Sequence, residues 1–441
     1  MVFSEVSVRR GQVAVFTAAE LDELNACGDA ELDPLVTAMA DHLGGVNAAA
    51  RLFKHALLEE RLSVEMLDVL LRENLITQPI VDFFRARQTL PALAWLNREQ
   101  IHAGGEFFRR RGLVTFIGLA FASLPACYCW NIEAMVLDTT GRLAQRHNIP
   151  RRIPETAQFV LDIGTAEAFI PGGIGIQAAH KIRLLHALIR YLLLGDPNAA
   201  ASKDSNTHSG PIPRWQPQKV GAPISQEFLA ATLLTFHYVV LHSMERLCMK
   251  LSEAEKRDYL QRWNVAGWLL GIEPRTLEKL QSMDDAAQLY QLVMTRRRAT
   301  TANGRALSAT LLRYMRDNLI EQVIGGILNP LTLVPRVLTR YLSGKETSAA
   351  LELRLTLLDR LLYIPIVLGT RFIGWLDNFP LFQSITRCMT RYAASHLWRL
   401  VHASKRPAAV VVAHDNERPR PTAVFVHPDL AAAWRIVRRP N

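Results

Sequence analysis

The chain has 441 residues, of which 49% are hydrophobic and 21% are charged. This balance is sufficient for a large buried core and excludes an intrinsically disordered chain. The 24 glycines and 22 prolines are ordinary numbers for this length, which excludes collagen-like and low-complexity classes. The length fits two or three domains or one large helical domain.

The charge balance is moderately basic, with 51 Lys and Arg against 41 Asp and Glu, a net charge of +10. A charge of this size permits an acidic partner such as nucleic acid or anionic lipid. The basic residues are diffuse and do not interleave with aromatic residues in a recognised motif, so we expect no nucleic-acid partner. The five cysteines are scattered and include no CxxC pair, which favours a reducing cytosol.

The N-terminus carries a twin arginine, Arg9-Arg10, but residues 11–20 lack the sustained apolar core of an export signal. We therefore expect a cytoplasmic protein, at most peripheral to the inner membrane. The longest apolar run, residues 113–137, has Glu133 as its single charge and is long enough to span a bilayer. Because it contains Pro125 and Asn131, we interpret it as a buried core helix pair broken near Pro125.

Almost every periodic segment has the helical period. Ser252 and Glu255 form a capping box that opens a helix, and Ser225 and Ser282 are in position to cap two more. Helices are predicted over residues 176–194, 228–249, 307–328 and 351–376, among others. Strands and helices do not alternate along the chain, which argues against a parallel-sheet nucleotide fold. The sequence thus predicts an all-α fold.

Two stretches depart from the helical pattern. Residues 196–223 are polar and rich in Pro, Gly, Ser and Asn, which predicts a long surface loop. Residues 408–413 and 422–426 are short β-prone runs that predict a small C-terminal hairpin or tail. Residues 387–441 hold ten Lys or Arg and three Asp or Glu. With the amphipathic stretch 357–375 they could contact an anionic membrane surface, and the alternative is a solvated tail.

Metal-protease, zinc-finger and serine-hydrolase motifs are all absent from the sequence. Among the 13 histidines, His186 is distinguished by its place in the middle of a strongly apolar helix, between Arg183 and Arg190. It can be a packed core histidine, which the spacing alone favours. It can also be an axial haem ligand, with the two arginines pairing with the propionates. His237 and His242 do not share a face of their helix and rank lower.

Residues 151–159 (RRIPETAQF) form a second candidate site. Pro150 and Pro154 mark the start of a helix, and Arg152 and Thr156, four residues apart, share a face of it. A guanidinium and a hydroxyl that project together can hold an anion, a propionate or an oxygen-derived ligand. The alternative, which the spacing alone favours, is a charged helix start with Thr156 bonded to its own backbone.

Together these two segments resemble the catalytic domain shared by latex-clearing proteins and the fungal membrane-bound oxygenase of mycophenolic acid biosynthesis. The resemblance begins with Arg152-x-x-x-Thr156 and resumes at residues 181–187 (KIRLLHA), which puts His186 thirty residues after Thr156. Residues 223–227 (PISQE) and 263–271 continue it, and residues 93–96 through Gly104-Gly105 precede it. It covers roughly residues 80–275 and is weaker beyond.

The resemblance implies a b-type haem in an all-helical fold with a globin-like core. His186 would be the proximal iron ligand, and Arg152 and Thr156 would line the distal side near bound O₂. Characterised latex-clearing relatives have a lysine just before the threonine, which can close the sixth coordination site, whereas this chain has Glu155. The distal site is therefore expected to be open, water-filled or ligated differently, and Glu155 is a candidate acid or base.

The implied activity is that of a dioxygenase-type enzyme that adds O₂ across, and cleaves, a carbon–carbon double bond of an apolar isoprenoid or unsaturated lipid-like substrate. Phe116, Phe121 and Leu124 are candidate walls for the alkene. The implied organisation is an N-terminal helical extension (1–80), an oxygenase-like domain (81–403) and a basic tail (404–441). Two alternatives stay open. One is a haem protein that does not oxygenate, such as a peroxidase-like enzyme or a sensor, and the other is a non-enzymatic, membrane-associated helical binding protein.

Overall fold

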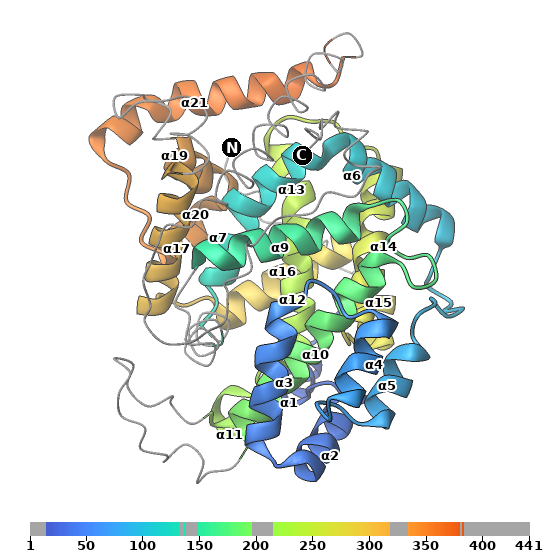
Figure 1. The fold of residues 1–441 in the computed structure, drawn as a ribbon. Helices are drawn as coiled ribbons and strands as arrows, with labels where there is room; N and C mark the ends of the chain where they lie inside the picture. The colour runs from blue at the N-terminus through green and yellow to red at the C-terminus, as the bar shows by residue number, and fades with distance from the viewer. Residues whose placement is uncertain are drawn as a thin grey trace, which may run out of the picture.

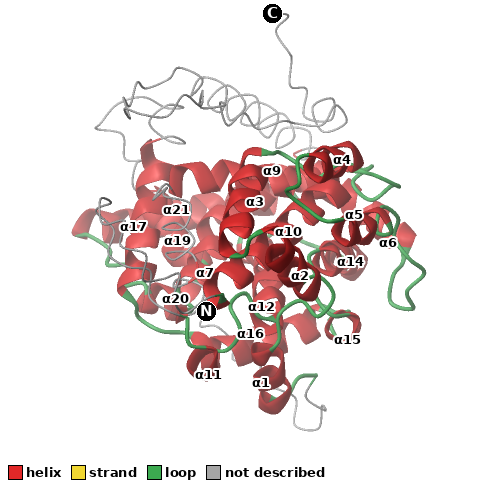
Figure 2. Cartoon of the chain, turned by 60° about the horizontal axis from the view of Figure 1, so that its bottom comes forward, coloured by secondary structure: helices red, strands yellow, loops and turns green. Residues whose placement is uncertain are grey.

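The computed structural model describes residues 15–131, 136, 149–195, 215–317, 334–379 and 382. Within these ranges the regular structure is helical, and the β pairing is confined to one isolated bridge between Trp130 and Arg298 (Figure 2). The predicted all-α fold is confirmed. The predicted C-terminal hairpin and the basic tail, residues 404–441, lie outside the described residues. The globin-like core stays a prediction.

The N-terminal helices gather at one end of the molecule (Figure 1). They are α1 (Ala18–Ala26), α2 (Asp33–Leu43), α3 (Val46–Leu58), α4 (Val64–Arg72) and α5 (Gln78–Arg85). Helices α2 and α3 pack on α10 (Ile174–Leu194), and α1 packs on α12 (Gln226–Phe236). Buried residues of this region, such as Val36 and Leu52, belong to the same hydrophobic cluster as the central helices. The N-terminal helices therefore help to hold α10 in place.

A long helical run leads from α6 (Arg98–Gly118) through a π-helical turn, η1 (Leu119–Ser123), into α7 (Leu124–Tyr128). Pro125 lies in the first turn of α7, and the wide turn just before it accommodates the missing N–H. The predicted break is thus a π-turn inside one run rather than a chain reversal. In the described part of the chain this run alone is long and apolar enough to cross a membrane. Its apolar window is 56% buried, and the run packs against α13 and α14 as a core helix does.

Helix α14 (Glu253–Leu269) lies closely against α6, and its predicted capping box at Ser252 and Glu255 is present. The contact depends on two glycines, because a Cβ on Gly104 would overlap the carbonyl oxygen of Asp258, and one on Gly105 would lie 2.8 Å from Arg262 Nη1. In the space that they leave, the buried Arg262 donates hydrogen bonds to main-chain oxygens. The acceptors are the carbonyl oxygens of Ile163 and Ile101, each at 2.7 Å, and of Thr165.

The guanidinium of Arg262 thereby joins three helices at one point, α6, α14 and the end of α9 (Ile149–Gly164). Burial lowers the pKa of Arg262 to about 9, so the group stays charged at neutral pH. Hydrogen bonds from a charged donor are stronger than neutral ones, which offsets part of the cost of its burial.

The second half of the chain completes the bundle. Its helices are α11 (Pro217–Val220), α12, α13 (Tyr238–Arg246), α14, α15 (Pro274–Glu278), α16 (Met283–Arg297), α17 (Ala302–Met315), α19 (Val334–Leu342), α20 (Gly344–Ala350) and α21 (Leu357–Leu376). Ser225 and Ser282 cap α12 and α16 as predicted.

Three predicted elements differ from the structure. The single helix expected over 228–249 is broken at His237, where φ is −113° and ψ is −65°. The helix expected over 351–376 begins at Leu357, because the side chain of Thr356 caps it. The end of the predicted loop 196–223 is packed: Trp215 is 6% exposed and donates to the Gly221 carbonyl oxygen at 2.8 Å. Residues 196–214 of that loop and 318–333 lie outside the described residues.

The α6–α14 contact makes Gly104→Ala destabilising, because the added methyl group meets main chain that cannot move aside. We expect a loss of about 1–3 kcal/mol in the free energy of unfolding, measured by thermal or urea denaturation. The matched control is Gly369→Ala in α21, where nothing lies within 4 Å of the new Cβ. This control should be neutral or stabilising by up to about 1 kcal/mol. Equal stability of both variants would contradict the role given to the contact.

Candidate functional site

The candidate site residues lie on two helices that pack against each other, α9 and α10. Helix α9 begins at Ile149 and includes both prolines of the predicted helix start. Arg152 and Thr156 are one turn apart on it, as their spacing predicts, and the side chain of Arg152 lies outside the described residues. The side chains of Glu155 and Thr156 are both half-buried. The structure therefore places the two predicted segments side by side.

His186 lies in the middle of α10 and has an unusual environment for an imidazole. Its Nδ1 is buried and has no hydrogen-bond partner, while the residue as a whole keeps intermediate exposure. Burial, reinforced by the positive charge of Arg190, lowers the pKa of His186 to about 3. The ring is therefore neutral at physiological pH. A neutral imidazole is the form of histidine that binds a metal ion.

Two further histidines, His180 and His237, have ring nitrogens that are all buried and without hydrogen-bond partners. Burial lowers the pKa of each to about 3. Both are 0% exposed, His180 against the ring of Phe84 and His237 at the break between α12 and α13. The sequence did not single out His180. Of these three residues only His186 keeps intermediate exposure, while its unpartnered Nδ1 is buried.

Arg183 and Arg190, both buried, make ion pairs with the segment that joins α1 to α2 and with the first residue of α2. Arg183 holds Asp29 with two hydrogen bonds, from Nε at 2.6 Å and Nη2 at 2.9 Å, and also reaches Glu31 at 2.8 Å. Arg190 holds Asp33 at 2.8 Å and donates to the Ile224 carbonyl oxygen at 3.1 Å. Both arginines are at most 3% exposed. The two guanidinium groups are thus engaged by carboxylates of the protein, which is a different set of partners from the expected propionates.

The carboxylates respond differently to these contacts. Burial would raise the pKa of Asp29, but the hydrogen bonds and charge of Arg183 hold it below its ordinary value. At Asp33 burial outweighs Arg190, and the pKa is raised. The interaction with arginine thus outweighs the cost of burial at Asp29, and the pair between Asp29 and Arg183 is the stronger of the two contacts that fix α10.

Segments that carried the resemblance meet at these ion pairs. Gln226, in the PISQE segment, donates to the carbonyl oxygens of Gly28 at 2.9 Å and Gly271 at 2.8 Å. Gly271 has a φ of +94°, and a Cβ there would contact the Asp29 carboxylate and the Arg183 guanidinium. Residues far apart in sequence thus close around one side of α10.

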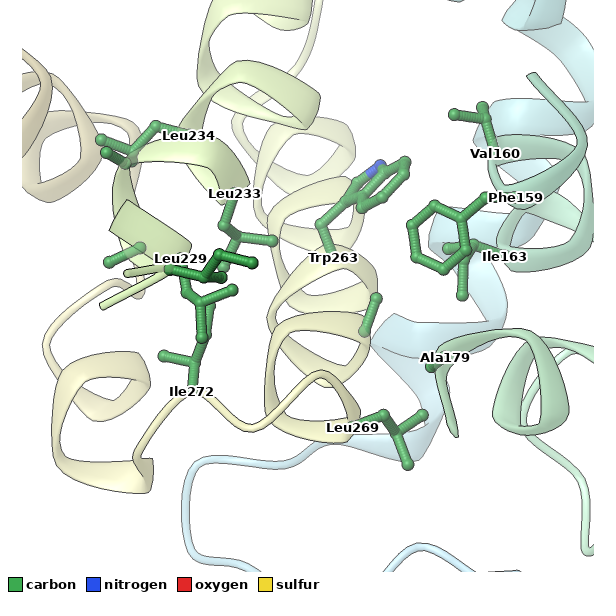
Figure 3. Packing of buried hydrophobic residues seen from close by; sticks show 14 of the residues in the cluster. Phe159, Val160, Ile163, Ala179, Leu229, Leu233, Leu234, Trp263, Leu269 and Ile272 are labelled. Atoms are coloured by element: carbon green, nitrogen blue, oxygen red, sulfur yellow. The ribbon is translucent and has the colours of Figure 1, made fainter. Parts of the chain in front are cut away.

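Apolar and aromatic side chains fill the space between α9, α12 and α14 (Figure 3). Trp263 lies edge-on to Phe159 with ring centroids 6.2 Å apart, and it stacks on Phe236 at 4.8 Å. The candidate wall residues Phe116, Phe121 and Leu124 lie on the run from α6 to α7. Of that run, α6 packs against α9. In the described residues no group of three or more His, Cys, Asp or Glu side chains could hold a metal ion.

Comparison with known proteins identifies the family. The model of the family described as "ER-bound oxygenase mpaB/B'/Rubber oxygenase, catalytic domain" matches residues 109–375, more than half of the chain. The chain belongs to this oxygenase family. The match starts later than the resemblance deduced from the sequence and extends a hundred residues further, to the end of α21.

Two relatives agree with this assignment. The chain is 26% identical over 338 residues to the rubber oxygenase of Streptomyces sp. (strain K30), covering 76% of this chain and 73% of that protein. Its fold matches the structure of latex clearing protein LCP in the closed state with a TM-score of 0.57 and 21% identity. That structural match covers 85% of this chain and 90% of the other. The oxygenase family and its helical fold are therefore established.

The ion pair between Asp29 and Arg183 predicts that Asp29→Asn is strongly destabilising. The substitution keeps the size of the side chain and leaves a buried guanidinium without its main countercharge, which costs about 3–5 kcal/mol. The control is Asp68→Asn, which breaks the pair with Arg85 in which both side chains are more than 40% exposed. This control should cost less than about 1 kcal/mol. Urea denaturation of both variants measures the difference, and similar losses would contradict the role given to the buried pair.

Proposed function

We propose that the protein is a haem b-dependent oxygenase that adds O₂ across, and cleaves, a carbon–carbon double bond of an apolar isoprenoid or unsaturated lipid-like substrate. The observation that carries the proposal is His186, a neutral imidazole of intermediate exposure whose buried Nδ1 has no hydrogen-bond partner, in a chain of an oxygenase family. The printed names of the relatives, rubber oxygenase and latex clearing protein, support an apolar substrate.

The residues present fit a haem. A b-type haem brings four ring nitrogens of its own, so the protein needs to supply one further donor among apolar side chains. His186 is such a donor, and Ile189 and Leu193, which share its face of α10, belong to the buried core. When bound, the haem would supply the iron chemistry that activates O₂ for addition to the alkene.

The chain's own contribution is to bind, orient and exclude water. Thr156 and, as the sequence predicts, Arg152 would donate hydrogen bonds to O₂, which stabilises negative charge as it develops there. Glu155, beside them, holds or accepts a proton. Phe116, Phe121 and Leu124 line the path of the alkene and keep water away. Arg183 and Arg190 act through their carboxylate partners as positioning residues that fix α10, and hence His186.

We also propose a cellular location for the protein, the cytoplasm. The scattered cysteines favour a reducing compartment, so the protein acts in the cytoplasm on an apolar metabolite. Product analysis with ¹⁸O₂ separates an oxygenase from a peroxidase-like enzyme or a sensor, because an oxygenase alone places labelled oxygen in the cleaved carbonyl products.

The first test is the absorbance spectrum of His186→Ala. Wild-type protein reconstituted with haem should show a Soret band, which the variant should lose or shift, since it lacks the axial donor. His180→Leu and His237→Leu are matched controls, because both replace buried, unpartnered imidazoles and should keep the wild-type spectrum. A wild-type protein that takes up no haem, or a His186→Ala variant with an unchanged spectrum, would overturn the proposal.

The second test separates turnover from haem binding. Thr156→Ala and Arg152→Ala should retain the haem spectrum, while the turnover number for a polyisoprenoid alkene falls by about 10²–10³ when a donor to developing charge is removed. Thr295→Ala, an exposed threonine on α16, is the control and should leave turnover unchanged. Full activity in both site variants would remove the roles assigned to α9.

A further inference from the structure

The exposed apolar side chains of the protein are concentrated on one helix, α21. Nine of the twelve large hydrophobic residues that are exposed in the described part of the chain belong to it or follow it directly. They are Leu357, Leu358, Leu361, Ile364, Leu368, Phe372, Ile373, Trp375 and Phe379. Most are spaced three or four residues apart, so they form a stripe along the outer face of the helix. A contiguous apolar surface of this kind marks an interaction site.

The opposite face of α21 is fixed to the body of the protein. Asp359, which is 0% exposed, closes the capping box with Thr356 and pairs with Arg336 at 3.0 Å. Gly374 lies so close to the carbonyl oxygen of Leu247 that no side chain fits there. The helix runs along one edge of the molecule (Figure 1), and the side chains of the stripe are exposed there. The apolar face is therefore held outward by specific contacts.

The C-terminal end of the helix is tied down as well. The side chain of Asn378 accepts a hydrogen bond from the Lys250 amide at 2.7 Å and donates one to the Cys248 carbonyl oxygen at 2.9 Å. Asp377 forms an ion pair with Arg111. Anchors at both ends keep the helix in one orientation.

The charges around the stripe have one sign. Asp359, the single acidic residue of α21, is buried and paired, so the outer face carries no carboxylate. Arg360 and Arg371 are exposed and lie at one edge of the stripe, three turns apart. Arginines in this position extend their charged heads to a lipid headgroup while their stems cover apolar surface. The net charge of +10 adds to the attraction for an anionic surface.

Aromatic residues gather at the C-terminal end of the stripe. Trp375 stacks on Phe372 with centroids 5.8 Å apart and lies edge-on to Phe379 at 4.7 Å. Tryptophan is enriched at the boundary between water and lipid, because its ring is apolar and its N–H is polar.

We propose that α21 is a membrane-docking helix that lies in the plane of an anionic bilayer, with its stripe among the acyl chains and Arg360 and Arg371 at the headgroups. A helix of 20 residues is about 30 Å long, which gives an extended line of contact. The docking needs no haem and is independent of the oxygenase activity proposed above. A second copy of the chain, or another segment of it, is the competing occupant of the stripe.

The test is flotation of the full chain with phosphatidylcholine vesicles, with and without 30% phosphatidylglycerol. The wild type should bind the anionic vesicles at least about tenfold more tightly than the neutral ones. Leu361→Asp/Leu368→Asp should abolish binding without lowering the melting temperature, because both side chains are exposed. Arg360→Gln/Arg371→Gln should lose the preference for anionic vesicles. Leu58→Asp, an exposed leucine on α3, is the control and should bind as the wild type does.

A second measurement places the helix in the lipid. Brominated acyl chains should quench tryptophan fluorescence in the wild type, and the quenching should be lost in Trp375→Phe. The proposal is overturned if the wild type binds neither type of vesicle, or if the double aspartate variant still co-floats with the anionic vesicles. It is also overturned if sedimentation shows a wild-type dimer that the same variant dissociates while vesicles fail to bind.

Discussion

The arrangement of the site depends on the buried contact between Arg183 on α10 and Asp29 in the connection from α1 to α2. Two parallel hydrogen bonds between a planar guanidinium and a carboxylate fix orientation as well as distance. Removing or displacing either side chain would leave the other charge buried without a countercharge, which is strongly unfavourable. Because His186 lies on the same helix, one turn further along, the contact also fixes the position of His186. The N-terminal helices thus belong to the support of the candidate site.

A second buried arginine, Arg262, fixes the position of α9. Arg262 reaches the carbonyl oxygens of Ile163 and Thr165 near the end of that helix, and Gly104 and Gly105 leave the room that it needs. The two arginines differ in how their buried charge is compensated. Arg183 is neutralised by carboxylates, whereas Arg262 is stabilised by peptide oxygens at helix ends, which carry partial negative charge. Together, Arg183 and Arg262 fix the positions of α10 and α9 relative to the shared hydrophobic core.

Local signals in the sequence predicted local structure well. The caps at Ser252 and Ser282 act through residues three positions away, so their effect is readable from a short window. The partners of Arg183 were not readable, because Asp29 is 154 residues distant and no short-range pattern marks the pair. The break at His237 was missed for a related reason, since an apolar run gives no sign of where packing interrupts it. His186 was identified from the sequence by its place in an apolar helix, whereas its intermediate exposure and its unpartnered Nδ1 follow from tertiary packing and were visible only in the structure.

The segments that carry the family resemblance are, in this structure, largely the frame of the site. Gln226, Gly271 and the pair Gly104-Gly105 make buried contacts between distant elements and touch no exposed surface. Replacing Gln226 would leave two buried carbonyl oxygens without their donor, and a Cβ at any of these three glycines would overlap a neighbouring group. These segments therefore preserve the contact between α6 and α14 and the placement of α10, and hence the position of His186.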